Sequence, residues 1–307
     1  MDSDRARGVL LGLACGDALG RPVEFKSASA ISSEHGQLTE MVGYGTWNQP
    51  PGTITDDTDQ ALCIARSLVE RETFDAADIA ERFVAWYDSG PFDIGGMTRR
   101  ALRLLSQGES WTRAGQQVWE QSPEGQNAGN GSTMRCPPLA IPYATDWNRL
   151  VRVSRQSSQI THYDPRCTYG CDVLNCTIAG FLQDDDDPLE RALDRTEPDA
   201  PDELVEALRL IPDHVDKDQL SNSGYVVHTL QTALHDGLTA NSAEDAIVTA
   251  VNRGGDTDTI GAVAGAVAGA RFGASSLPNR WLEEINERDE LEELAMALWR
   301  RPHSNGV

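Results

Sequence analysis

Lysine is almost absent from this sequence, which contains only Lys26 and Lys217. All Lys and Arg residues together number 26, against 48 Asp and Glu residues, so the formal net charge is −22 at pH 7. This balance excludes routine nucleic-acid binding, because phosphate backbones require basic surfaces. The acidic residues are dispersed over the whole chain, and such a surface resists self-association but repels itself at low salt. We therefore expect a halophilic protein that is more stable in molar KCl than in dilute buffer.

Long hydrophobic runs are missing as well. The most apolar segment, residues 260–270, ends at Arg271 and is too short to cross a bilayer. We therefore expect no membrane association. Residues 1–7 are charged, and Gly12 and Asp17 interrupt the apolar run that follows, so the pattern of an export signal is not seen. The expected location is the cytoplasm.

The six cysteines show no zinc-binding spacing. Cys167, Cys171 and Cys176 are four and five residues apart, and they lack the two-residue spacing of a zinc knuckle. In a cytoplasmic protein we expect these thiols to be reduced.

Segments of alternating polar and apolar residues are almost absent, whereas apolar residues recur at spacings of three and four over most of the chain. This pattern predicts an all-α fold. No stretch resembles a linker, and the acidic residues 183–202 are interpreted as a surface excursion, so residues 1–307 are expected to form a single domain. Gly261, Gly265 and Gly269 lie four apart and form a ridge without side chains, which another helix can approach closely.

Two short acidic clusters lie about two hundred residues apart. Residues 55–59 read Thr-Asp-Asp-Thr-Asp, residues 256–259 read Asp-Thr-Asp-Thr, and each cluster precedes an apolar helical segment. Carboxylates one or two positions apart do not share a face of a regular helix, so they converge only where a helix begins. Capping by Asp and Thr explains either cluster alone. Both together hold more negative charge than capping uses, and crowded carboxylates repel unless cations intervene, so the pair predicts a two-metal site.

Four further segments have the composition of binding loops. Glu24 lies on a loop that leaves a helix through the glycines of residues 16–20. Residues 93–98 and 130–135 are turns of small residues that can offer backbone N–H groups to phosphate oxygens. His162 lies beside an aromatic residue in an expected loop. Each segment alone is equally typical of an ordinary turn or a structural histidine.

In combination and order, these motifs resemble those of the ADP-ribosylglycohydrolase family, the ADP-ribosyl-acceptor hydrolases that include the dinitrogen reductase-activating glycohydrolase. The resemblance covers nearly the whole chain, and its most diagnostic part is Asn-Arg-Gly-Gly-Asp-Thr-Asp-Thr-Ile-Gly at residues 252–261. The other matching segments are residues 8–12, 16–20, Glu24, and residues 55–58, 129–135 and 161–162. The chain departs from the family at Gly96-Met97, where Asn-Thr is common after Asp-Ile-Gly.

The resemblance implies a compact orthogonal helical bundle with a binuclear site for two divalent cations, Mg²⁺ or Mn²⁺. The metal ligands that it implies are Thr55, Asp56, Asp57, Asp256, Asp258 and Thr259. Residues expected to line the ADP-ribose pocket are Gly95, Asn130, Gly131, Ser132 and His162.

The implied activity is hydrolysis of the glycosidic bond between ADP-ribose and an acceptor, foremost a mono-ADP-ribosylated arginine on a protein. Cleavage at the ribose carbon passes through an oxocarbenium-like state that needs electrostatic support. Two hard cations can orient the ribose diol and lower the pKa of a water molecule. Candidates for the catalytic acid or base are Glu24, Asp57, Asp256 and Asp258, and the sequence leaves the choice among them open.

Three alternatives compete with this hypothesis. The same scaffold can bind ADP-ribose without cleaving it, or serve as a structural protein. It can instead hydrolyse serine-linked or O-acetyl-ADP-ribose, so the expected partner is an ADP-ribosylated protein or a small ADP-ribose conjugate. A two-metal phosphoesterase is disfavoured, because such sites usually recruit histidines and neither acidic cluster has a histidine neighbour.

Overall fold

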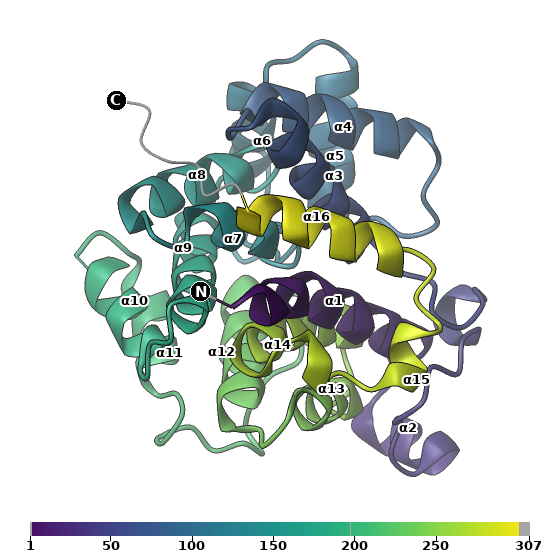
Figure 1. Ribbon diagram of the computed structural model, residues 1–307. Helices are drawn as coiled ribbons and strands as arrows, with labels where there is room; N and C mark the ends of the chain where they lie inside the picture. Colours follow the sequence, from purple (N-terminus) through teal and green to yellow (C-terminus); the bar gives the residue numbers. More distant parts are fainter. Residues whose placement is uncertain (1, 197, 301–307) are drawn as a thin grey trace.

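Helices form nearly all of the regular structure in the described chain, residues 2–196 and 198–300 of a computed structural model (Figure 1). Within these residues there are three isolated β-bridges and no strand, which confirms the predicted all-α fold. The helices are α1 (Ser3–Gly20), α2 (Ala28–His35), α3 (Asp56–Arg71), α4 (Ala76–Asp88), α5 (Gly96–Ser106), α6 (Trp111–Glu120), α7 (Ala140–Tyr143), α8 (Trp147–Gln159), α9 (Pro165–Leu182), α10 (Pro188–Thr196), α11 (Asp202–Arg209), α12 (Val226–Thr239), α13 (Ala243–Asn252), α14 (Thr257–Phe272), α15 (Asn279–Leu282) and α16 (Arg288–Arg300). Short 3₁₀ turns are η1 (Arg21–Val23), η2 (Gly45–Trp47), η3 (Pro137–Leu139) and η4 (Ala274–Ser276).

The centre of the fold is the pair α1 and α14, which lie side by side although they come from opposite ends of the chain (Figure 1). Helix α14 is buried on every side from Thr257 to Ala270, as expected for a helix without a polar face. Their contact is made of glycines. A Cβ atom on any of these residues would overlap the backbone of the opposite helix: Gly8, Gly12 and Gly16 of α1, and Gly269, Gly265 and Gly261 of α14. The predicted close approach at the glycine ridge is therefore confirmed.

The remaining helices surround this pair. Helix α16 packs across α1, and α12 and α13 pack against α14 (Figure 1). Residues 183–202, interpreted from the sequence as a surface excursion, contain α10, which buries Leu189 and Leu193 in the hydrophobic core. All six cysteines are buried and unpaired. Among the described helices, none combines the length and apolar character that a bilayer crossing requires.

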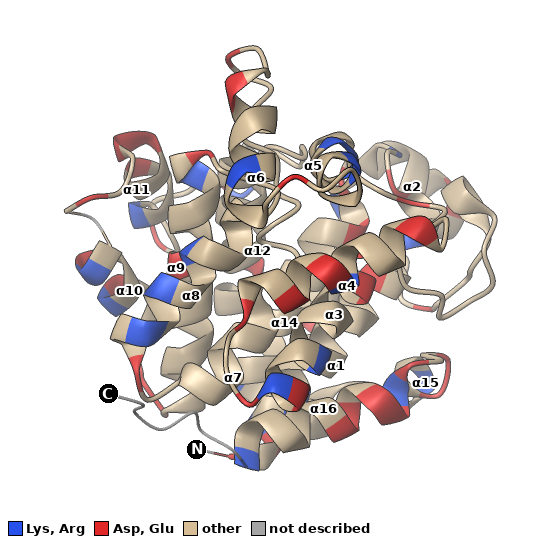
Figure 2. Cartoon of the chain, turned by 90° about the horizontal axis from the view of Figure 1, so that it is seen from above, with Lys and Arg blue, Asp and Glu red and all other residues tan. Residues whose placement is uncertain are grey.

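The acidic excess is spread over the outer helices, where Figure 2 shows Asp and Glu on α4, α11 and α16. We propose that the protein is halophilic and expect its melting temperature to rise by about 5 °C or more between dilute buffer and 2 M KCl. Salt screens the mutual repulsion of the excess negative charges. It also weakens exposed ion pairs such as Arg66–Glu290, but each of these contributes only about 0–1 kcal/mol.

Thermal melts at fixed pH would measure this effect. Sucrose at the same osmolality is the control for exclusion of solute from the protein surface. A melting temperature that stays constant or falls in KCl would show that self-repulsion does not limit stability.

Candidate functional site

The two acidic clusters meet at the starts of two neighbouring helices. Helix α3 begins at Asp56 and α14 begins at Thr257, so both clusters lie at helix N-termini as predicted. The Thr259 hydroxyl donates to Asp57 Oδ2 over 3.3 Å, across 202 positions of sequence. On the other side, the Thr55 hydroxyl donates to the same oxygen over 3.2 Å. Asp57 thus lies between hydroxyls of the two clusters.

Helix α1 holds both helix starts in place. Its glycines pack against α14, and its buried Asp17 accepts the backbone N–H groups of Thr55 and Thr58 at 3.0–3.2 Å. Asp17 therefore caps α3 from a different helix. Burial raises the pKa of this carboxyl to about 7, against the opposing hydrogen bonds from Thr58 and Thr55. The sequence placed Asp17 in a glycine-rich segment and gave no indication of this capping role.

The carboxylates of the site are buried and face one another. Burial, followed by the charges of Asp17, Asp56 and Asp256, raises the pKa of Asp57 well above its usual value. Burial and the neighbouring carboxylate of Glu24 have the same effect on the pKa of Asp258. Burial and mutual repulsion together mean that the anionic forms need a compensating charge.

The site fits divalent cations. Asp57 Oδ1 is buried and has no hydrogen-bond partner within the described chain, so it is free to ligate an ion. Glu24, Asp93 and Asp258 each bring one carboxylate oxygen within 4.8 Å of the others. Carboxylate and hydroxyl oxygens are the donors that Mg²⁺ and Mn²⁺ prefer. The acidic cluster can therefore hold a metal ion.

A hollow of about 400 Å³ opens over these carboxylates. It brings together most of the predicted site residues, namely Glu24, Asp56, Asp57, Gly95, Asn130, Gly131, His162, Asp256, Asp258 and Thr259. Two predicted residues do not line it. Thr55 is the buried N-cap of α3, and its hydroxyl donates to Asp57. Ser132 Oγ lies 2.9 Å from Ser158 Oγ on α8, because the side chain at this turn position faces the interior.

Asn130 and Gly131 have distinct places in the hollow. The Asn130 side-chain amide donates to Asp256 Oδ2 at 2.7 Å and to Thr229 Oγ1 at 2.9 Å, so both of its hydrogens are used within the protein. Asn130 therefore orients Asp256. A Cβ atom on Gly131 would overlap the ring of His162, so glycine is required here for the histidine to reach the hollow.

Asp93 is the acid that sequence reasoning did not single out as a site residue. It belongs to the segment 93–98, which was identified as a phosphate-binding turn, and its carboxylate faces Glu24 and Asp258. Burial and the charge of Asp256 raise its pKa to about 6. An acid directly before a glycine turn is the only sequence signal for this role.

The loop of residues 42–50, which we call the rim loop, closes one side of the hollow. Its Trp47 donates Nε1–H to Glu24 Oε2, and its ring centroid lies 6.0 Å from that of Phe92. Buried Arg21 holds this loop through backbone carbonyls at 2.9–3.2 Å. These acceptors are the carbonyls of Tyr44, Gln49 and Pro50 in the loop, and the carbonyl of Thr53 just after it. The rim loop thus holds Glu24 through Trp47, and Arg21 of the adjacent η1 turn holds the rim loop.

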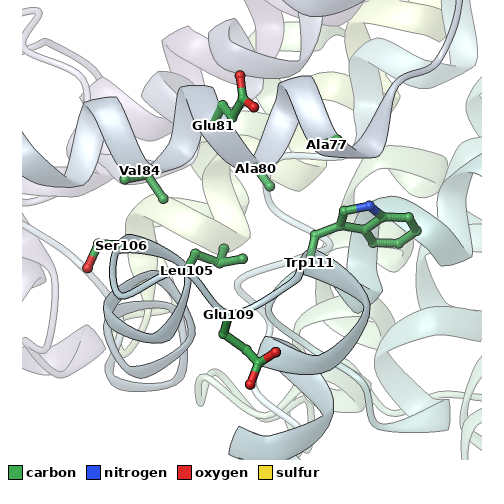
Figure 3. A pocket seen from close by; sticks show the side chains of 8 residues that line it. All are labelled: Ala77, Ala80, Glu81, Val84, Leu105, Ser106, Glu109 and Trp111. Atoms are coloured by element: carbon green, nitrogen blue, oxygen red, sulfur yellow. The ribbon is translucent and has the colours of Figure 1, made fainter.

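A second hollow, of about 390 Å³, lies between α4 and the connection from α5 to α6 (Figure 3). It is lined by Ala77, Ala80, Glu81, Val84, Leu105, Ser106, Glu109 and Trp111. Figure 3 shows its two glutamates pointing away from each other. The two hollows have similar volumes. The first is distinguished by the carboxylates that converge on it, and not by its size.

The raised pKa values predict an unusual dependence of stability on pH. Burial and the charge of Asp93 raise the pKa of Glu24 to about 8. With Asp17 and Asp93 also raised, the cation-free folded protein binds more protons than the unfolded chain between about pH 4 and pH 8. Its stability therefore falls as pH rises through this window, and we expect a drop in melting temperature on the order of 5 °C.

Melting curves in EDTA and in Mg²⁺ from pH 5 to pH 8 would measure this drop. Mg²⁺ should reduce it, because a cation replaces the bound protons and stabilises the folded state by mass action. A melting temperature in EDTA that rises from pH 5 to pH 8 would contradict the proposed electrostatics. A melting temperature that is the same in Mg²⁺ and in EDTA would contradict it as well.

Comparison with known proteins gives a consistent result over the whole chain. The family model described as ADP-ribosylglycohydrolase matches residues 2–306. The ADP-ribosyl-[dinitrogen reductase] glycohydrolase of Rhodospirillum rubrum is 36% identical, covering 94% of this chain and 92% of the relative. The ADP-ribosylarginine hydrolase Tri1 of Pseudomonas putida (strain GB-1) is 34% identical, covering 97% and 78%. A solved structure named ADP-ribosylglycohydrolase-related protein complex superposes with a TM-score of 0.81 at 35% identity, covering 98% of both chains.

Proposed function

Because this chain belongs to the ADP-ribosylglycohydrolase family, we propose that it is a metal-dependent hydrolase that releases ADP-ribose from modified arginine side chains of a protein. The observation that carries the proposal is the meeting of two distant acidic clusters around Asp57, at the floor of one hollow. The relatives named above act, by their names, on ADP-ribosyl-dinitrogen reductase and on ADP-ribosylarginine.

The proposed metal ligands are those implied by the resemblance. They are Thr55, Asp56, Asp57, Asp256, Asp258 and Thr259. Two divalent cations bound there would supply Lewis-acid stabilisation of negative charge and a water molecule of lowered pKa. The chain itself orients these groups: Asp17 caps α3, Asn130 fixes Asp256, and the Gly95 N–H donates to Asp56 Oδ2 at 3.3 Å.

The charge of the hollow supports an arginine acceptor. Six carboxylates line it, and no lysine or arginine stands among its described lining residues. Two divalent cations would offset the four proposed ligand carboxylates. The remaining pair, Glu24 and Asp93, can still attract a guanidinium group, whereas a neutral serine oxygen is not attracted. Glu24, held by Trp47, is suited to exchange a proton with the leaving group, because its pKa lies within reach of neutral pH.

The diphosphate needs donors that do not come from basic side chains. Helix α5 begins at Gly96, and residues 95–98 line the hollow. The first N–H groups of a helix have no partner within the helix and bind anions. We propose that this helix start binds the diphosphate of ADP-ribose.

The test is the release of free ADP-ribose from arginine-, serine- and O-acetyl-linked substrates, in Mg²⁺, in Mn²⁺ and in EDTA. We expect cleavage of the arginine linkage, its loss in EDTA and its recovery on adding metal back. Equal turnover in EDTA would rule out the metal mechanism, and a preference for another linkage would rule out the arginine acceptor. Tight binding of ADP-ribose without turnover on any linkage would favour a non-catalytic binding protein.

A further inference from the structure

A chain of hydrogen bonds runs beneath the floor of the hollow and ends at His162. Its centre is Arg135, which is 0% exposed and lies 4.4 Å above the ring of Phe83. The Arg135 guanidinium donates Nη2–H to Thr161 Oγ1 at 2.6 Å. Thr161 Oγ1 in turn lies 2.7 Å from His162 Nδ1. Arg135 ends the segment 130–135 that the sequence singled out, and none of the roles above uses it.

The number of hydrogens on each group determines which group donates in each of these hydrogen bonds. Arginine only donates, so Thr161 Oγ1 is an acceptor toward Arg135. The threonine hydroxyl has one hydrogen, and the described contacts of Thr161 Oγ1 are Arg135 Nη2 and His162 Nδ1. If Nδ1 carried a proton, the Thr161 hydrogen would be buried without an acceptor, which is costly. Thr161 therefore donates to Nδ1, and the ring hydrogen of neutral His162 is on Nε2.

Because His162 lines the hollow, its Nε2–H group is available to a ligand bound there. Its ring lines the cavity, and a Cβ atom placed on Gly131 would lie 3.1 Å from Nε2. Burial and the charge of Arg135 lower the pKa of the ring to about 3, so His162 is neutral at physiological pH. An Nε2–H donor in a hollow with six carboxylates is suited to an acceptor oxygen of a ligand.

Arg135 also orients a second side chain, that of Gln60. Its Nη1–H donates to Gln60 Oε1, which fixes the orientation of the amide. Gln60 Nε2 then points to Asp56 Oδ2 at 3.3 Å. Buried Arg135 therefore orients the Gln60 amide toward Asp56, a proposed metal ligand. Through Thr161 it also orients the His162 ring toward the cavity.

We propose that Arg135 is a positioning residue that, through the Thr161 hydroxyl, holds His162 as the Nε2–H tautomer and so supplies the hollow with a permanent neutral donor. The donor binds an oxygen of the ADP-ribosyl group, and this last step alone rests on the proposed function. The tautomer is a property of the resting protein and is measured without substrate or turnover.

The experiment is ¹⁵N NMR of protein labelled at histidine, with the His162 signals assigned from the His162→Gln variant. We expect wild-type His162 to carry its proton on Nε2 and to keep it there from pH 6 to pH 8. Thr161→Val removes the hydrogen bond to Nδ1, so the Nδ1 resonance should move to the position of an unbonded imine nitrogen. Thr161→Ser retains the hydroxyl and should leave that resonance in place. In Arg135→Met, the Thr161 hydroxyl is free to accept, and a population with Nδ1–H should appear.

Binding of ADP-ribose in Mg²⁺ gives a second readout. We expect Thr161→Val to raise its Kd about tenfold and Thr161→Ser to leave it near the wild-type value. A wild-type His162 protonated on Nδ1 would overturn the proposal, and so would an Nδ1 resonance that Thr161→Val does not move. If Arg135→Met folds and His162 keeps the wild-type tautomer, Arg135 does not position His162. If that variant does not fold, the wild-type spectrum and the Thr161 pair decide the question. Absence of hydrolysis would affect none of the spectra.

Discussion

Asp57→Asn should lower turnover of ADP-ribosylated arginine by about a hundredfold or more and, in the same protein without cations, should raise the melting temperature. The loss of turnover follows from removing a proposed carboxylate ligand of the metal, since even groups that only orient metal ligands are worth about 10- to 100-fold. The gain in stability follows from the raised pKa of Asp57. Burial, followed by the charges of Asp17, Asp56 and Asp256, opposes ionisation of this carboxyl, and asparagine has no proton to lose. A purely structural aspartate would lose activity and stability together.

Asp59→Asn is the matched control, two positions further along the same helix. Asp59 Oδ2 accepts the Trp86 Nε1–H at 2.8 Å and is not among the residues that line the hollow. We expect turnover within about twofold of wild type for this variant, because the half-buried Asp59 side chain is held by Trp86 of α4 and does not line the hollow. Steady-state kinetics and melting curves in EDTA and Mg²⁺ test both variants. Equal losses of turnover in the two would show that the acidic cluster acts as a whole and that Asp57 has no special place in it.

Gly12→Val should destabilise the protein by about 3 kcal/mol or more, because the new side chain would overlap the backbone carbonyl of Gly265. The backbone of α14 cannot move aside without separating the two central helices, since the glycine contacts continue at Gly8 and Gly16. Gly12→Ala should also lower the free energy of unfolding, but by a smaller amount. The effect extends to the site, because the start of α14 carries Asp258.

Chemical denaturation measures this loss, and Gly96→Ala serves as the control. Gly96 is the first residue of α5, its φ angle is not in the left-handed region, and a Cβ atom there meets nothing within 4 Å. Its replacement should leave the free energy of unfolding unchanged or slightly higher. If Gly12→Val unfolds at the wild-type denaturant concentration, the close contact of α1 and α14 is not the basis of the fold.

The sequence predicted the helical class and the two helix starts because both depend on local signals. Threonine and aspartate before an apolar periodic segment mark an N-terminus, and α3 and α14 begin within these clusters. The glycine ridge predicted a close helix contact but not its partner, because spacing contains no information on which surface fits the ridge. Helix α1 carries its own glycines at matching intervals, and only the fold pairs them with α14.

The remaining features of the site depend on side-chain direction in turns, which sequence spacing does not determine. Ser132 and Asn130 belong to the same motif, yet Ser132 faces α8 while Asn130 reaches Asp256. Asp93 was visible only as the first residue of a glycine turn, and its approach to Glu24 depends on loops from separate parts of the chain. Asp17 reads as part of a helix, and its capping of α3 is a contact between helices.

Arg21 binds the rim loop through main-chain oxygens, at Tyr44, Gln49 and Pro50, and binds the carbonyl of Thr53 just after it in the same way. Every amino acid provides such an oxygen, so the anchor tolerates exchange of the side chains at these positions. Tyr44, for example, is 59% exposed and accepts from Arg21 through its backbone carbonyl. The proposed metal ligands lie on other segments, so exchanging residues 42–50 between relatives would test whether the rim loop selects the substrate without altering those ligands.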